Sequence, residues 1–219
     1  MSRNILDPED RRISGNVVEL DRVPIAIRDT GSYPDLDQLQ PGDLLLVSPS
    51  KPNLTARMIQ WGQQRVHSAD NAIWMHAALY LGDNALVEID GGGVSVSPLF
   101  KYVLTHKLLF RRVLTDAGAD ISPIVGYRIA IAALKEFKRR YSHENIFITA
   151  YDCLTAGTRA APTRAIRSRG SICSDFFNEV VFATTNRPAA PVDRLPLQPA
   201  DLSASKLMRD ISIGWGSLV

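Results

Sequence analysis

A cysteine at the start of a predicted helix is the residue of this chain best suited to covalent chemistry. In the stretch GSICSDFFNEVV, residues 170–181, apolar side chains follow Cys173 at i+3, i+4, i+7 and i+8, which is the spacing of an amphipathic helix. A thiol in the first turn of a helix has a lowered pKa, and the thiolate that results is a good nucleophile. A thiol that only packs in the core gives the same pattern and is commoner. A base close to the thiol would favour the interpretation that Cys173 is a nucleophile and not only a core residue.

Histidine is the residue that usually activates a cysteine nucleophile. The chain has four histidines. His67 and His143 lie in polar, turn-like sequence, and His106 lies in a connection before Lys107. His76 lies within the apolar run IWMHAALYL, where a strand can hold an imidazole ring in register. We therefore expect His76 to be the base.

The sequence after His76 predicts a β-hairpin that brings an acid to it. Apolar runs at 73–81 and 85–89 flank a Gly-Asp-Asn triplet typical of turns. A three-residue loop there puts His76, Glu88 and Asp90 on one face, because side chains alternate along a strand. We expect Glu88 to accept the Nδ1–H hydrogen bond of His76 and to leave Nε2 for the thiol. For Asp90 we prefer a solvated strand end before the glycine turn.

Further periodicities predict an α+β domain around this hairpin. A Pro-Gly turn leads into a buried strand at 44–47, and Asn53 is a suitable N-cap for a helix beginning near Leu54. Other strands are expected at 94–96 and 108–114. These elements indicate a small, mainly antiparallel sheet packed against helices.

A longer helix is predicted from Pro123 to about Tyr141. Ser122 is its expected N-cap, with proline at the first helical position. Its apolar spacing is expected to place four large side chains toward the core, namely Ile124, Ile131, Leu134 and Phe137.

The length of the chain suits one medium-sized domain. Residues 1–35 are polar with short apolar runs, and we expect a loosely held N-terminal arm or edge strand there. Residues 36–219 are expected to form the main domain. The motif LQPGDL at 39–44 returns as LQPADL at 197–202, which indicates two turns that lead into different elements.

Composition argues against several classes of function. A hydrophobic content of 45% is enough for a packed core, whereas a net charge of +2 and sparse aromatic residues give no indication of nucleic-acid binding. No apolar run approaches the ~20 residues that a membrane span needs, and the N-terminus lacks a signal-peptide pattern. We expect synthesis in the cytoplasm, and any export to be independent of a signal peptide. The histidines and the two cysteines, Cys153 and Cys173, lack paired metal-ligand spacing, and we expect neither a metal nor a cofactor.

Four short motifs occur in an order that resembles a known family. PGDLLLV, HAALYLGDNALVEIDGGGV, YDCL and CSDFFNEV, within about residues 39–182, resemble the circularly permuted NlpC/P60 group of papain-like cysteine hydrolases, in its YiiX/YaeF-like branch. In this group the histidine precedes the cysteine, which is the reverse of the unpermuted order. Each motif is short, but four in order are a fairly specific signal.

The resemblance implies a permuted papain-like fold and a set of site residues. Cys173 would be the nucleophile, His76 the base and Glu88 the residue that orients the base. Tyr151 would lie near the oxyanion site. The chain departs from the family at Asp175, where members usually have glutamate.

Arginines are concentrated between Tyr151 and Cys173. Such a cluster is most often a solvated loop. The sharper hypothesis is a lid that binds an anionic group of the substrate and keeps the thiolate charged, with Arg169 among the substrate-binding residues. The cluster consists of Arg159, Arg164, Arg167 and Arg169.

These residues predict a cysteine hydrolase, an amidase or peptidase that works through an acyl-enzyme. The resemblance points to cell-wall peptides as the substrate class. A lipid acyltransferase of similar permuted fold is the close alternative, because the same acyl-enzyme can pass its acyl group to an alcohol or amine. A non-catalytic module that binds a peptide or a partner protein is the other alternative. An exported bacterial effector is compatible with both enzymes, and an immunity or inhibitor protein would then be its partner.

Overall fold

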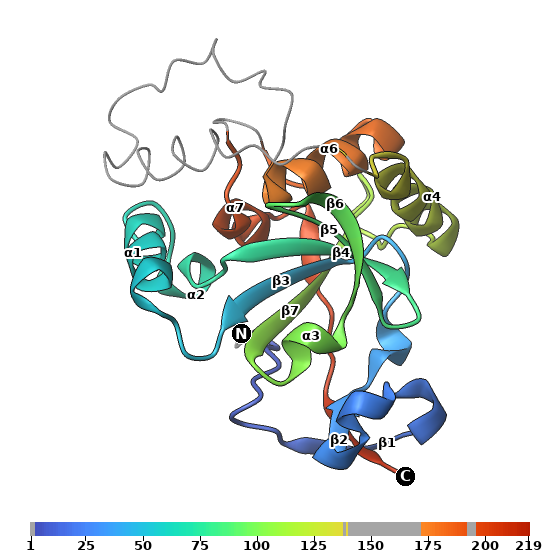
Figure 1. Cartoon of the computed structure of the whole chain (residues 1–219). Coiled ribbons are helices and arrows are strands. Elements are labelled where there is room, and N and C mark those ends of the chain that lie inside the picture. The colour runs from blue at the N-terminus through green and yellow to red at the C-terminus, as the bar shows by residue number, and fades with distance from the viewer. Residues whose placement is uncertain (1–2, 138, 140–171, 192–195) are drawn as a thin grey trace.

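Two β-sheets organise the molecule (Figure 1). The computed structural model describes residues 3–137, 139, 172–191 and 196–219. The larger sheet has six strands in the order β6-β5-β4-β3-β7-β8, and each neighbouring pair is antiparallel. Its strands are β3 (Leu44–Pro49), β4 (His76–Gly82), β5 (Ala85–Asp90), β6 (Gly93–Pro98), β7 (His106–Val113) and β8 (Met208–Asp210).

The smaller sheet joins the two ends of the described chain. Its order is β1-β9-β2, with β9 parallel to β1 and antiparallel to β2. The N-terminal segment, which we expected to be a loosely held arm or edge strand, supplies the two edge strands β1 and β2 of this sheet. The strands are β1 (Ile13–Val18), β2 (Ser32–Pro34) and β9 (Trp215–Leu218), and short 3-10 turns lie at Leu20–Arg22, Ile25–Thr30 and Leu36–Gln38.

Helices cover the larger sheet on both faces. Helices α4 and α6 pack against each other and against β4, and α3 packs against β7 (Figure 1). Helix α1 begins after Asn53, whose side chain accepts a hydrogen bond from the N–H of Ala56 at 2.8 Å, as the sequence predicted. The described helices are α1 (Leu54–Gln63), α2 (Ala69–Ala72), α3 (Phe100–Val103), α4 (Pro123–Lys135), α6 (Cys173–Thr185) and α7 (Pro199–Ala204).

Side chains of the central strands alternate between two apolar cores, as expected for a sheet buried on both faces. In β3, Leu44 and Leu46 belong to the core that contains residues of α4 and α6. Leu45 and Val47 belong to the other core, which contains residues of the smaller sheet. The predicted class, α+β with a mainly antiparallel sheet packed against helices, is confirmed.

The β4–β5 hairpin has the predicted register but a different turn. Asp83 and Asn84 both have positive φ, 46° and 60°, so the connection is a two-residue turn and not a three-residue loop. Gly82 pairs with Ala85, and a bulge follows before the regular pairs resume. The bulge compensates for the shorter turn, so Ala78 still lies opposite Glu88.

Helix α4 turns small side chains inward, and this corrects our expectation. The Ser122 side chain accepts the N–H of Val125, as predicted, but the helix ends at Lys135 and not near Tyr141. Its buried residues are Gly126, Ile129, Ala130 and Ala133. The four residues predicted to face the core are 41% to 67% exposed, namely Ile124, Ile131, Leu134 and Phe137.

A close backbone contact causes this orientation. A Cβ atom on Gly126 would lie 2.2 Å from the carbonyl oxygen of Pro41, and one on Gly42 would lie 2.7 Å from the carbonyl oxygen of Gly126. The helix backbone therefore lies directly against the turn before β3. Only the small face of α4 fits there.

The repeated LQPxDL motif forms the same local contact twice. The Asp43 carboxylate accepts the N–H of Gln40 at 2.8 Å, and the Asp201 carboxylate accepts the N–H of Gln198 at 2.7 Å. The first copy leads into β3 and the second into α7, as predicted.

Candidate active site

Cys173, His76 and Glu88 are linked in series by hydrogen bonds. His76 Nε2 lies 2.7 Å from Glu88 Oε2, and the Cys173 thiol is hydrogen-bonded to the His76 side chain. Cys173 is 6% exposed and Glu88 is 1% exposed, while the His76 side chain is 22% exposed. A sulfur, an imidazole and a carboxylate thus lie together in a largely buried site.

The thiol and the imidazole meet at the end of a strand. Cys173 belongs to the same core as Ala77, whereas Ala78, opposite Glu88, belongs to the other core. Alternation therefore directs His76 and Glu88 to the face away from α6. Contact is possible because His76 is the first residue of β4 and Cys173 the first residue of α6. The predicted position of His76 inside the strand is corrected to the strand end.

The imidazole uses the ring nitrogen opposite to the one that we expected for the carboxylate. Glu88 binds Nε2, and Nδ1 is thus the nitrogen left for the sulfur. The sequence places a residue on a face of a strand, but the orientation of its ring depends on side-chain torsions.

Glu88 accepts hydrogen bonds from three further side chains. The Tyr102 hydroxyl donates to Oε2 at 2.6 Å, and the Ser97 hydroxyl and the Lys101 ammonium donate to Oε1. The Tyr102 ring centroid lies 6.1 Å from that of His76. The carboxylate therefore has a partner on every side and is held in one position.

Charges in the site favour an imidazolium–thiolate pair. Burial opposes ionisation of the Cys173 thiol, but His76 and the N–H groups of Ala77 and Ser174 lower its pKa below the ordinary value. Burial also opposes protonation of His76, yet the Cys173 thiolate and Glu88 raise its pKa to about 10. Burial likewise disfavours ionised Glu88. The side chains that donate hydrogen bonds to this carboxylate, of which His76 has the largest effect, nevertheless hold its pKa well below the ordinary value.

The start of α6 is fixed by residues next to the nucleophile. The Ser174 hydroxyl donates to the carbonyl oxygen of Leu197, and the Asp175 carboxylate accepts the N–H of Leu197 at 2.7 Å. Ile172 is the N-cap and offers no side-chain acceptor to the first turn. Among the described residues the first turn of α6 therefore has no side-chain cap, and uncapped N–H groups at a helix start commonly bind anionic groups.

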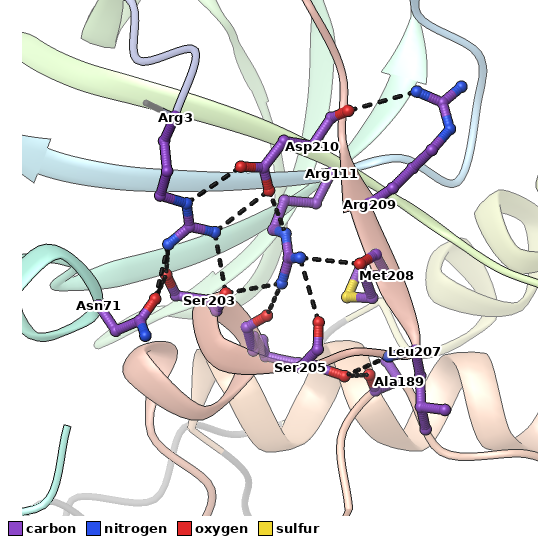
Figure 2. Close-up of polar contacts among 11 residues, drawn as sticks. Arg3, Asn71, Arg111, Ala189, Ser203, Ser205, Leu207, Met208, Arg209 and Asp210 are labelled. Carbon is purple, nitrogen blue, oxygen red and sulfur yellow. Dashed lines mark hydrogen bonds and ion pairs between the residues drawn. The ribbon is translucent and has the colours of Figure 1, made fainter. Parts of the chain in front are cut away.

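An arginine-centred network fixes the segment that carries α7 (Figure 2). The Arg111 guanidinium donates to the carboxylate of Asp210 at 2.7 Å and to the carbonyl oxygens of Ser203 and Met208, each at 2.8 Å. Arg3 also binds Asp210, at 3.0 Å. Since Leu197 lies just before α7, a network that fixes α7 also supports the contacts of Leu197 with the start of α6.

Other candidate residues from the sequence lie apart from this series or outside the described residues. Asp90 is exposed and its carboxylate accepts the N–H of Gly92 at 2.9 Å, as expected for a strand end before a turn. Tyr151, Arg169 and Cys153 lie outside the described residues. The same holds for the rest of the arginine cluster, Arg159, Arg164 and Arg167.

Sequence reasoning missed Ser97, Lys101 and Tyr102. Glu88 lies opposite Ser95 in the β5–β6 pair, so Ser97 is a diagonal neighbour on the same face. Strand alternation could have found this serine. Lys101 and Tyr102 belong to the one-turn helix α3, whose position relative to β5 has no local sequence signal.

Metal binding is not indicated by the described part of the chain. Within it, no group of three or more His, Cys, Asp or Glu side chains is placed to hold an ion. Cys173, His76 and Glu88 lie in series through hydrogen bonds. No helix of this part is long and apolar enough to cross a bilayer.

Comparisons with known proteins give a likeness of fold. No protein-family model matches the sequence, and no curated protein matches it. The structure is similar to the crystal structure of metalloprotein yiiX from Escherichia coli O157:H7, DUF1105, with a TM-score of 0.51 and 13% sequence identity. The match covers 80% of this chain and 97% of that one. At this identity the likeness concerns the fold alone, and it is to the branch that the sequence motifs resembled.

Proposed function

We propose that the protein is a cysteine hydrolase of the permuted papain-like, NlpC/P60 type that cleaves an amide or peptide bond. The observation that carries this proposal is the series Cys173–His76–Glu88, in which a thiol at a helix start touches an imidazole held by a buried carboxylate. The residues have the three roles that thiol-dependent acyl transfer needs, which are nucleophile, base and orienting group.

In the first half of the reaction, the thiolate of Cys173 attacks the carbonyl carbon of the substrate. The carbonyl oxygen becomes an oxyanion, and backbone N–H groups in the first turn of α6 stabilise it. The His76 imidazolium then gives its proton to the leaving nitrogen as the C–N bond breaks. The products are a thioester on Cys173, a free amine and a neutral imidazole.

In the second half, neutral His76 takes a proton from water, and the hydroxide attacks the thioester. Collapse of the tetrahedral intermediate releases the carboxylic acid and restores the thiolate beside the imidazolium. Glu88 keeps the ring in one orientation throughout and stabilises its positive charge. Cell-wall peptide amides are the substrate class that the sequence resemblance supports.

The rate at which Cys173 reacts with iodoacetamide, measured from pH 4 to 10 by peptide mass spectrometry, tests the ion pair. The measurement uses a Cys153→Ser variant, in which Cys173 carries the one remaining thiol. We expect a midpoint below the ~8.5 of a free thiol, and a rise of that midpoint in His76→Ala. His67→Gln is the control, because His67 binds Asp201 near α7, and it should leave the midpoint in place.

A midpoint near 8.5 that His76→Ala does not move would instead favour a non-catalytic binding module. An activity assay separates the two enzymes. Incubation with cell-wall fragments should release amines in the wild type and not in Cys173→Ala. Transfer of acyl chains from lipids to an alcohol or amine, with cell-wall fragments left intact, would identify an acyltransferase instead.

A further inference from the structure

Helix α4 presents large apolar side chains to solvent. It lies on the outside of the molecule beside α6 (Figure 1). Its exposed residues follow a 3-4-3 spacing over about three turns, and one more apolar residue follows the helix end. We call this set the α4 face. It consists of Ile124, Tyr127, Ile131, Leu134 and Phe137, which are 41% to 67% exposed.

Packing among the described residues does not account for the apolar side chains of the α4 face. The inward side of the helix consists of Ile129 and three small residues, and Gly126 lies there against Pro41 and Gly42. A helix covered on one side normally carries polar residues on the other, and contiguous exposed apolar side chains mark an interaction surface. Phe182 of the neighbouring helix α6 is also 51% exposed.

Positive charge borders the α4 face. Arg128 and Lys135 lie on one flank of the apolar residues, about 80° and about 60° from their centre at about 100° per residue, and both are exposed. The acidic side chains nearby, Glu136 and Glu179, are both paired with Arg139, at 3.6 Å and 2.7 Å. Three basic side chains thus stand against two acidic ones, and this small positive excess suits an anionic partner.

The shape of the surface favours a bilayer over a peptide. Peptide helices dock in apolar grooves, whereas the α4 face is the convex side of a single helix. The two cavities characterised in the described part of the chain are lined by other residues, one around Tyr33 and Tyr80 and one around Arg3 and Arg111. A convex apolar face with basic residues beside it is typical of helices that lie in the membrane interface.

We propose that the α4 face docks on an anionic lipid bilayer. Ile124, Ile131 and Leu134 enter the boundary between headgroups and acyl chains, and Arg128 and Lys135 bind lipid phosphates. The proposal depends only on this surface and not on the reactivity of Cys173.

Flotation of the full-length protein with vesicles tests this docking. We expect binding to vesicles of phosphatidylcholine with 30% phosphatidylglycerol, and much weaker binding to phosphatidylcholine alone or in 0.5 M NaCl. Ile131→Glu should weaken binding to the anionic vesicles at least tenfold. Arg128→Gln and Lys135→Gln should each weaken it about fivefold, which corresponds to about 1 kcal/mol for each basic residue near an anionic surface.

A matched control is Leu54→Glu on α1, another exposed apolar residue on a helix, 80% exposed. It should bind vesicles as the wild type does, and circular dichroism should show that every variant keeps its fold. Equal loss in Leu54→Glu and Ile131→Glu would overturn the assignment to α4. Absence of vesicle binding by the wild type would overturn the docking itself. Light scattering would then show whether Ile131→Glu disperses a dimer, which would make the α4 face an interface between copies.

Discussion

The ammonium group of Lys101 binds the oxygen of Glu88 that His76 leaves unused. Glu88 Oε1 accepts from Lys101 and Ser97, and Oε2 accepts from His76 and Tyr102. The Glu88 carboxylate is thus placed between two cationic groups, the Lys101 ammonium and the His76 imidazolium. Because the residue is only 1% exposed, neither cation is well screened by water. Lys101 therefore helps to keep Glu88 ionised where burial alone would protonate it.

Lys101→Met should make the protein less stable at neutral pH and less sensitive to acid. The lowered pKa of Glu88 gives stability that is present above the ordinary glutamate pKa and is lost as pH falls below it. Without Lys101 the pKa is lowered less, so less stability is lost on acidification. Urea unfolding at pH 7 should show a loss of about 1 kcal/mol, since a half-exposed ion pair contributes about that much. At pH 3 the variant and the wild type should differ less.

Lys107→Met is a matched control for Lys101→Met. Each lysine side chain is 36% exposed, but Lys107 pairs with the 22%-exposed Asp7 whereas Lys101 pairs with buried Glu88. We expect the smaller loss for Lys107→Met. Equal losses at pH 7 would mean that the position of Lys101 beside the imidazole–carboxylate pair has no particular effect.

Glu88→Gln should lower the pKa of His76 from about 10 by at least about one unit, because a neutral amide replaces the carboxylate at Nε2. A raised histidine pKa keeps the imidazolium present up to that pH. A lower pKa of His76 therefore lowers the highest pH at which the imidazolium–thiolate pair is present. Nitrogen-15 NMR of the His76 ring measures the shift directly. Asp90→Asn, on the exposed strand end, should leave the titration unchanged, and a shift of similar size there would point to a general charge effect.

Local patterns in the sequence were sufficient to predict where Cys173 and Glu88 lie in their elements and which strand carries His76, though not that His76 is its first residue. The helix start at Cys173 and the pairing of Ala78 with Glu88 follow from side-chain periodicity over a few residues. Periodicity predicts such positions because the buried face of a helix or strand carries apolar residues at a fixed spacing. The predicted three-residue loop was wrong, yet the register survived because a bulge offsets the shorter turn.

Contacts between distant segments were beyond the reach of local patterns. Helix α4 has an apolar face of large residues and an apolar face of small ones, and the contact of Gly126 with Gly42 selects the small face. Spacing within the helix cannot report a contact that lies over 80 residues away in the sequence. Lys101 was missed for a similar reason, because the packing of α3 against β7 places its side chain where it reaches Glu88.

Asp175→Asn should stabilise the protein at neutral and alkaline pH. Burial raises the pKa of Asp175 to about 7, with further repulsion from Glu179 and Asp201, against the lowering effects of the Leu197 N–H and Arg139. An acid with a raised pKa binds its proton more tightly in the folded state, so stability falls as pH rises from about 4 to 7.

Asparagine in this position keeps an oxygen for the N–H of Leu197 and carries no charge. The gain at pH 8 should reach up to about 4 kcal/mol, at about 1.4 kcal/mol for each pKa unit, and it should disappear near pH 4. Urea unfolding at the two pH values measures the difference. Glu179→Gln, at a 50%-exposed side chain, should change the stability at pH 8 much less, because relief of the repulsion on Asp175 is offset by loss of the ion pair with Arg139. If Asp175→Asn lowers stability at pH 8, the ionised carboxylate is itself needed to hold the start of α6 beside Leu197.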